Sequence, residues 1–140
     1  MINIKTMFLL AVLCIIAVSC ARLFNRNAGA QRAITAYATV NVDEFLNLLT
    51  DARMQLLDVR SRDEFDEGHI AGAVLVDVNE SDFMDKAIAV LDKARPVAVY
   101  CRSGRRSARA ASLLTAQGFQ VTNLAGGVMA WQDAGKSLVK

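Results

Sequence analysis

The stretch from Val97 to Ser107 constrains the fold of this 140-residue chain more than any other part of its sequence. It begins with Val97 to Tyr100, four apolar and mostly β-favouring residues that predict a buried strand. Ser103 and Gly104 then loosen the backbone, and Ser107 stands where a helix N-cap is expected, directly before an alanine-rich run. The stretch therefore predicts a strand, a short loop and a helix in immediate succession.

Cys101 lies at the point where this predicted strand ends. The amides of the loop and the positive end of the helix dipole would converge on its side chain. Arg102, Arg105 and Arg106 add positive charge, and no acidic residue occurs in the loop or in the predicted helix. Amides and cations both stabilise a thiolate, so we expect the pKa of Cys101 to lie below that of a free cysteine.

Strand and helix patterns alternate along the rest of the chain. Short apolar runs predict strands, and apolar residues at helical spacing predict helices. This alternation favours an α/β fold, an open parallel five-stranded sheet with helices on both faces. The predicted strands are residues 37–40, 54–59, 73–76, 96–100 and 121–124, and the predicted helices are a segment capped by residue 41 and residues 81–93, 108–117 and 128–134, with 61–68 as a polar turn.

Each of the longer predicted helices carries an apolar face that we expect to be buried against the sheet. These faces consist of Val42, Phe45, Leu46 and Leu49 in the first helix, Phe83, Ala87, Ile88 and Leu91 in the second, and Ala110, Ala111, Leu113 and Leu114 in the third.

Charge is distributed unevenly. The formal net charge is only +2, which argues against a nucleic-acid partner. Residues 58–67 hold five acids, whereas residues 101–110 hold four arginines and no acid. This local positive charge surrounds Cys101 and favours a small anionic substrate.

The pattern of the N-terminal residues predicts a targeting segment. Met7 to Val18 is an uninterrupted apolar run of twelve, which is short for a transmembrane helix. Ala17 to Cys20 resembles the end of a bacterial lipoprotein signal, with Cys20 as the lipidated residue. Cleavage after Ala21 and an uncleaved membrane anchor are the alternatives. We therefore expect residues 1–20 to be a signal or short anchor, residues 21–36 a tether and residues 37–137 the domain, exported and held at a membrane, in a bacterial periplasm.

The cysteine pattern singles out one thiol. The chain has three cysteines, of which Cys14 lies in the apolar run and Cys20 lies two residues after it. Cys101 is then the only thiol of the predicted domain and has no internal disulfide partner. In an exported protein a single remaining cysteine is a candidate reactive thiol.

Several short motifs follow one another in a fixed order along the predicted domain. They are Leu57-Asp58-Val59-Arg60, Glu64-Phe65, residues 68–73, residues 101–107, Gly118-Phe119 and residues 123–127 with Trp131. In this order and spacing they resemble the rhodanese family of sulfurtransferases over about residues 37–135. The one clear departure is Ala71, where a proline is common in that family.

The resemblance implies transfer of a sulfane sulfur from a donor such as thiosulfate, through a persulfide on Cys101, to an acceptor such as cyanide or a thiol. It implies that Cys101 is catalytic and needs no metal and no organic cofactor. A sulfur relay that passes its persulfide to a protein acceptor with little small-molecule turnover is the alternative. By the resemblance, the substrate cradle consists of Arg102, Ser103, Gly104, Arg105 and Arg106, with Arg102 and Arg106 in direct contact with the anion.

The length of the loop separates sulfur transfer from phosphate chemistry. Cysteine phosphatases place their phosphate-binding arginine after five intervening residues, and here that position is Ser107. Four residues lie between Cys101 and Arg106. The shorter loop favours transfer of one sulfur atom over binding of a tetrahedral phosphoryl group.

Other polar or aromatic residues near the motifs have structural interpretations. Asp58 and Arg60 are interpreted as a salt bridge or loop brace, with a catalytic role as the alternative, and with Ser107 they form the predicted supporting residues. His69, the only histidine, is interpreted as a hydrogen-bonded turn residue rather than a general base. Trp131 is expected to pack the last helix against the sheet.

Overall fold

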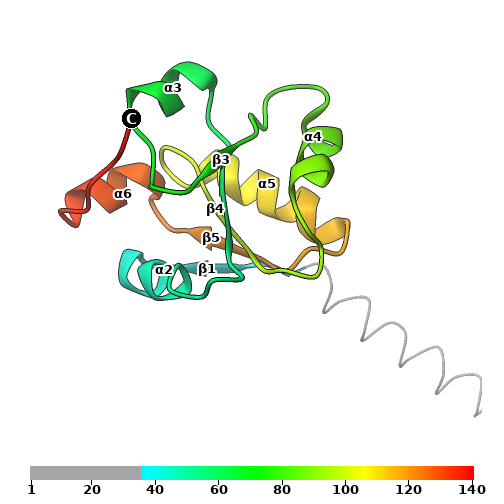
Figure 1. Ribbon diagram of the computed structural model, residues 1–140, viewed down its shortest axis with the longest axis horizontal. Helices are drawn as coiled ribbons and strands as arrows, with labels where there is room; N and C mark the ends of the chain where they lie inside the picture. Colours follow the sequence, from blue (N-terminus) through cyan, green and yellow to red (C-terminus); the bar gives the residue numbers. More distant parts are fainter. Residues whose placement is uncertain (1–35) are drawn as a thin grey trace, which may run out of the picture. The chain divides into compact units, whose positions relative to one another are not determined.

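The computed structural model describes residues 36–140 and shows a five-stranded, entirely parallel sheet (Figure 1). The strand order is β1-β5-β4-β2-β3. This confirms the predicted α/β fold, and four of the strands are one residue shorter than predicted at one or both ends. The strands are β1 (Ala38–Val40), β2 (Gln55–Asp58), β3 (Val74–Leu75), β4 (Val97–Tyr100) and β5 (Val121–Leu124).

Five helices within the described residues connect the strands. Asn41 caps the first of them through a reciprocal capping box with Glu44, as its sequence position predicts. The helices are α2 (Val42–Leu48), α3 (Arg62–Glu67), α4 (Phe83–Val90), α5 (Arg105–Ala116) and α6 (Gly127–Asp133).

The prediction of a turn at residues 61–68 is wrong, because Arg62–Glu67 forms α3. Ser61 accepts a hydrogen bond from the Glu64 amide, and the Glu64 carboxylate accepts one from the Ser61 amide. This capping box offsets the weak helical signal of a polar segment that buries no residue. The Ser61-x-x-Glu64 spacing was the local signal for this helix.

Helices cover both faces of the sheet, and the alternation of side chains along the strands divides the core into two parts. One face of the sheet packs against α4 and α5 and the other against α2 and α6, which confirms the predicted layering. The first part includes Leu57, Val97, Val99, Val121, Phe83, Ala87, Ala110 and Leu114. The second includes Leu56, Ala98, Tyr100, Leu124, Phe45, Val128 and Trp131.

Three of the predicted core positions are exposed instead. Leu46, Ile88 and Leu113 are 38%, 46% and 41% exposed. The buried stripe of each helix is narrow, since α5 reaches the sheet through Ala110, Ala111 and Leu114 and leaves Leu113 at its edge. The helical period was correctly predicted, but the width of the buried face was overestimated.

The C-terminal residues pack against the domain. His69 and Val139 exchange two backbone hydrogen bonds, each of 2.8 Å. The His69 ring stacks on Phe65 with centroids 3.7 Å apart, and its Nδ1 lies 3.1 Å from the Phe65 carbonyl oxygen. Trp131 is 5% exposed and donates to the Ser137 carbonyl. The predicted structural roles of His69 and Trp131 are thereby confirmed.

The expectations for the N-terminus lie outside the described residues. They include the signal or anchor at residues 1–20, lipidation of Cys20 and the tether before the domain. In the part of the chain from residue 36 onward, none of the helices combines the length and the apolar character that a membrane span requires.

Candidate active site

Cys101 is placed by β4, which lies inside the sheet between β2 and β5. All four residues of β4 are buried, so the strand holds the following residue rigidly. Gly104 has φ 92°, a left-handed conformation that lets the chain turn from the loop into α5. The loop therefore lies at the carboxyl end of a parallel strand, where ligand sites of open α/β sheets are found.

The prediction that Ser107 caps this helix is wrong. Helix α5 begins at Arg105, with Gly104 as its N-cap residue, so Ser107 lies within the first turn. Because the chain turns at Gly104, the helix begins three residues earlier than predicted, and the Ser107 hydroxyl donates to the thiol instead of capping an amide. Ser107 is fully buried and its Oγ lies 3.3 Å from Cys101 Sγ.

The loop supplies hydrogen bonds to the sulfur of Cys101. The Gly104 amide donates to Sγ over 3.1 Å, and the Ser107 hydroxyl donates from within the helix. Cys101 is only 1% exposed, and this burial raises the pKa of its thiol. The hydrogen bonds from Ser107 and from the amides of Ser103 and Gly104 outweigh burial, so that the pKa of Cys101 lies below its ordinary value. The pKa of Cys101 is therefore lowered, as predicted, and hydrogen bonds from a hydroxyl and from amides are the cause.

Substituting Ser107→Ala is expected to raise the pKa of Cys101 because it removes the hydroxyl donor. Alkylation by iodoacetamide should become about tenfold slower at neutral pH, the scale of one lost hydrogen bond to a charged group, and its pH midpoint should move upward. Ser112→Ala, on the exposed side of the same helix, is the matched control. An unchanged pH profile for Ser107→Ala would show that the hydroxyl does not stabilise the thiolate.

The backbone of the Cys101 loop is hydrogen-bonded to the start of α6. The Val128 amide donates to the Cys101 carbonyl over 2.8 Å, and the Met129 amide donates to the Arg102 carbonyl over 3.1 Å. Gly127 makes this approach feasible, since a Cβ on it would lie 2.3 Å from the Cys101 carbonyl oxygen. These bonds turn the carbonyls of Cys101 and Arg102 toward α6. The sequence indicated only a turn at Gly126 and Gly127, so this support was not predicted.

Arg106 forms a bidentate ion pair with Glu64 of α3. The two nitrogen to oxygen distances are 2.7 and 2.6 Å, and both side chains are 27% exposed. The hydrogen bonds from Arg106 lower the pKa of Glu64 to about 2 against the opposing effect of burial, and Ser61 adds further hydrogen bonds. Glu64 was not among the predicted site residues. Contact of Arg106 with a substrate anion stays a prediction, and in the described structure the guanidinium is held by Glu64.

The Glu64 carboxylate is expected to make folding sensitive to acid. Its folded pKa of about 2 lies below the ordinary 4.5, so its contribution is complete above about pH 4.5 and is lost as the pH falls toward 2. Glu64→Gln should lower the Tm at pH 7 by about 5 °C, as expected for a loss of about 1 kcal/mol. The difference in Tm between the wild type and Glu64→Gln should be smaller at pH 3. Glu67→Gln on the same helix is the control, and a difference that is constant with pH would contradict the assignment.

Asp58 and Arg60 form a buried ion pair beneath the loop, as predicted. Arg60 Nη2 lies 2.7 Å from Asp58 Oδ2 and donates to the Gly68 carbonyl over 2.8 Å. The Arg60 amide also donates to Asp58 over 3.0 Å. This pair links the end of β2 to the end of α3, so its role is to brace the site.

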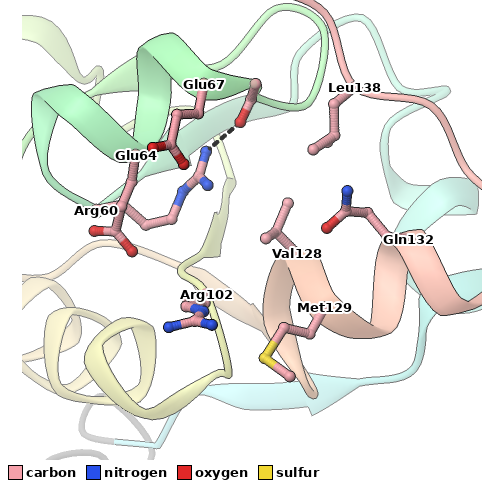
Figure 2. A pocket seen from close by; sticks show the side chains of 9 residues that line it. Arg60, Glu64, Glu67, Arg102, Val128, Met129, Gln132 and Leu138 are labelled. Atoms are coloured by element: carbon pink, nitrogen blue, oxygen red, sulfur yellow. Dashed lines mark hydrogen bonds between the residues drawn. The ribbon is translucent and has the colours of Figure 1, made fainter.

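Two hollows flank the Cys101 loop. One, of about 540 Å³, contains three arginine side chains and lies beside the start of α5. The other, of about 430 Å³, lies between α3 and α6 (Figure 2). Arg102, Ser103 and Arg105 are exposed, which leaves them accessible to a ligand. The first hollow is lined by Asn79, Ser103, Arg105, Arg106 and Arg109.

Comparison with known proteins places this site in a family. A sequence model described as the rhodanese-like domain matches residues 41–134. The chain belongs to the rhodanese-like family. It is 33% identical over 103 residues to a thiosulfate sulfurtransferase of Shewanella oneidensis, covering 72% of this chain and 98% of that protein. It is 35% identical over 107 residues to thiosulfate sulfurtransferase 18 of Arabidopsis thaliana, covering 68% and 78% of the two chains.

Solved structures agree with this assignment. The crystal structure of a rhodanese-related protein from Thermoplasma volcanium superposes with a TM-score of 0.66 at 27% identity. The superposition covers 74% of this chain and 98% of that chain. The described residues therefore have the fold of a solved rhodanese-related structure.

Proposed function

We propose that this rhodanese-like protein is a sulfurtransferase that carries sulfur as a persulfide on Cys101. The observation that supports the proposal most is the setting of the thiol, which receives hydrogen bonds from Gly104 and Ser107 and has a lowered pKa. A thiolate is the attacking form of cysteine, so lowering its pKa raises the reactive fraction at neutral pH. The sulfurtransferase relatives support the same chemistry.

In the first half-reaction, the Cys101 thiolate attacks the outer sulfur of thiosulfate. A new S–S bond forms on Cys101, the S–S bond of thiosulfate breaks, and sulfite departs with the electron pair of that bond. The loop amides then face the added sulfur and stabilise its negative charge. No oxidant, metal or organic cofactor enters this step.

Exposed arginines are suited to hold the anionic donor. Arg102 in the loop and Arg105 at the start of α5 are exposed, and neither forms an ion pair among the described residues. Arg106 is bound to Glu64 by two hydrogen bonds, so its guanidinium is engaged before a donor arrives. We therefore propose that Arg102 and Arg105 contact thiosulfate, in place of the Arg102 and Arg106 that the resemblance implies.

Steady-state formation of thiocyanate from thiosulfate and cyanide tests the enzyme proposal. A sulfurtransferase should sustain many turnovers, with sulfite and thiocyanate released in equal amounts. Persulfide formation without sustained turnover would instead identify a sulfur relay that serves a protein acceptor. Absence of persulfide on the full-length protein would contradict both functions.

We also propose that the N-terminus holds the domain at a membrane outside the cytoplasm, with lipidation at Cys20. The support is the apolar run followed by Ala17 to Cys20 in the sequence. Cys20→Ala should release the protein from the membrane fraction or leave an unprocessed precursor, as measured by fractionation and intact mass. A variant that is processed and retained like the wild type would exclude lipidation at this residue.

A further inference from the structure

The ion pair of Arg106 and Glu64 lies where the two hollows that flank the Cys101 loop adjoin each other. Arg106 belongs to the lining of the arginine-rich hollow, together with Ser103 and Arg105. Glu64 belongs to the lining of the other hollow, and Figure 2 shows it among the side chains of α3 there. The carboxylate that holds Arg106 therefore comes from outside the hollow in which the arginines gather.

The contact between the two side chains is bidentate and anchored. Nη1 and Nη2 of Arg106 each donate to a different oxygen of Glu64, over 2.7 and 2.6 Å. Two parallel charge-assisted hydrogen bonds fix the relative orientation of both groups. The amide and the hydroxyl of Ser61 also donate to the Glu64 carboxylate, each over 3.1 Å. Arg106 is thus held by an acceptor that is itself fixed to the first turn of α3.

This pairing reduces the positive charge that Arg106 can offer to a bound anion. Hydrogen bonds with Glu64 are the main cause that raises the pKa of Arg106 above its ordinary value, and the charge of Cys101 contributes. The guanidinium is therefore close enough to the thiolate for their charges to interact. The carboxylate of Glu64 neutralises the guanidinium and occupies both of its terminal nitrogens, so that little of this charge remains for a ligand.

The charge near Cys101 has to meet two opposing requirements of sulfur transfer. Thiosulfate is a dianion and must bind, but sulfite is also an anion and must leave before the next step. One more free guanidinium would strengthen the binding of both anions. Stronger binding of substrate and product alike lowers KM without raising kcat, and it slows the release of sulfite.

We propose that Glu64 is a positioning residue that keeps Arg106 off the anion site and thereby limits how tightly the donor and sulfite are bound. Its role in turnover rests on the proposed sulfurtransferase function, whereas its effect on anion binding does not require a persulfide. Without the carboxylate, the guanidinium is free to turn into the hollow that Ser103 and Arg105 line, where it adds a further cation to the anion site.

Binding of thiosulfate and sulfite to full-length Cys101→Ser protein tests this restraint without sulfur transfer. We expect Glu64→Gln in this background to bind both anions about tenfold more tightly by calorimetry, the scale of about 1.4 kcal/mol. Glutamine also serves in a capping box, so α3 should be retained. Glu67→Gln removes the same charge from an exposed position of α3, and both dissociation constants should change by less than about twofold.

Arg106→Gln in the same background shows whether the tighter binding comes from this guanidinium. Glu64→Gln should have no effect on anion binding once Arg106 is replaced. A structural disturbance of α3 would not tighten binding in a way that depends on Arg106. Binding that Glu64→Gln weakens or leaves unchanged would overturn the restraint, and so would a gain that persists without Arg106.

Steady-state kinetics with Cys101 intact provide the second measurement. Glu64→Gln should lower the KM for thiosulfate and the inhibition constant of sulfite, without a rise in kcat. A higher KM for thiosulfate would contradict the restraint, because it would mean that Glu64 orients Arg106 toward the donor. If the protein forms no persulfide, the proposed function fails, and the binding measurement on Cys101→Ser protein still decides the role of Glu64.

Discussion

Replacing Cys101 with serine is expected to abolish sulfur transfer completely. A serine hydroxyl remains protonated at neutral pH and has no sulfur on which a persulfide can form. The substitution changes one buried atom and keeps the hydrogen bonds of Gly104 and Ser107 within reach, so the fold should be retained. Thiocyanate formation should fall to the uncatalysed background, while the circular dichroism spectrum and Tm stay close to those of the wild type.

The other two cysteines provide the matched control for this loss. Cys14→Ser and Cys20→Ser should leave transfer by the purified full-length protein unchanged, because neither residue belongs to the domain that holds the site. Cys101→Ser could instead keep some activity that disappears only when Cys14 or Cys20 is also replaced. That result would assign the reaction to one of those two thiols and would contradict the role of Cys101.

Gly127→Ala is expected to produce the second largest loss. A Cβ at this position would lie 2.3 Å from the Cys101 carbonyl oxygen and 2.6 Å from the Arg102 carbonyl oxygen, so the loop and α6 must separate. That movement breaks the hydrogen bonds from Val128 and Met129 and misplaces the loop amides. Displacement of a catalytic group by about 1 Å can cost about 100-fold in rate, and we expect a loss of transfer on that scale.

Gly135→Ala is the control that distinguishes the effect of this contact from the effect of backbone strain. Gly135 has φ 72°, comparable with φ 58° at Gly127, but a Cβ added to Gly135 would meet no other atom within 4 Å. Both substitutions therefore impose a left-handed conformation on alanine and should lower the Tm. Only Gly127→Ala should lower the rate of transfer by folded protein, measured after correction for the folded fraction. Equal losses in both variants would contradict the importance of the contact between α6 and the loop.

Features that depend on local sequence were predicted well. The strand that ends at Cys101, the helix that follows and the five parallel strands all come from apolar patterns within short windows. The lowered pKa of Cys101 also follows from its own loop, because Ser103, Gly104 and Ser107 lie within six residues of it. The prediction missed one cause of the lowered pKa, because the buried Ser107 hydroxyl donates a hydrogen bond to the sulfur instead of capping the helix.

Features that depend on distant parts of the chain were missed. Arg106 and Glu64 are 42 positions apart, and no pattern in the sequence indicates that α3 brings the carboxylate to the loop. Gly127 touches the backbone of Cys101 only because α6 begins directly beside the loop. The capping box of Ser61 and Glu64 is different, because that signal is local and predicts α3 when it is used.

Intact-mass measurement after treatment with thiosulfate tests the central claim most directly. The sample should be the full-length protein with Cys14 and Cys20 replaced by serine, so that Cys101 is its only thiol. We predict a gain of one sulfur atom, which cyanide removes and which Cys101→Ser does not show. If the protein with Cys101 intact gains no sulfur under these conditions, the assignment of Cys101 as the sulfur-carrying residue is contradicted.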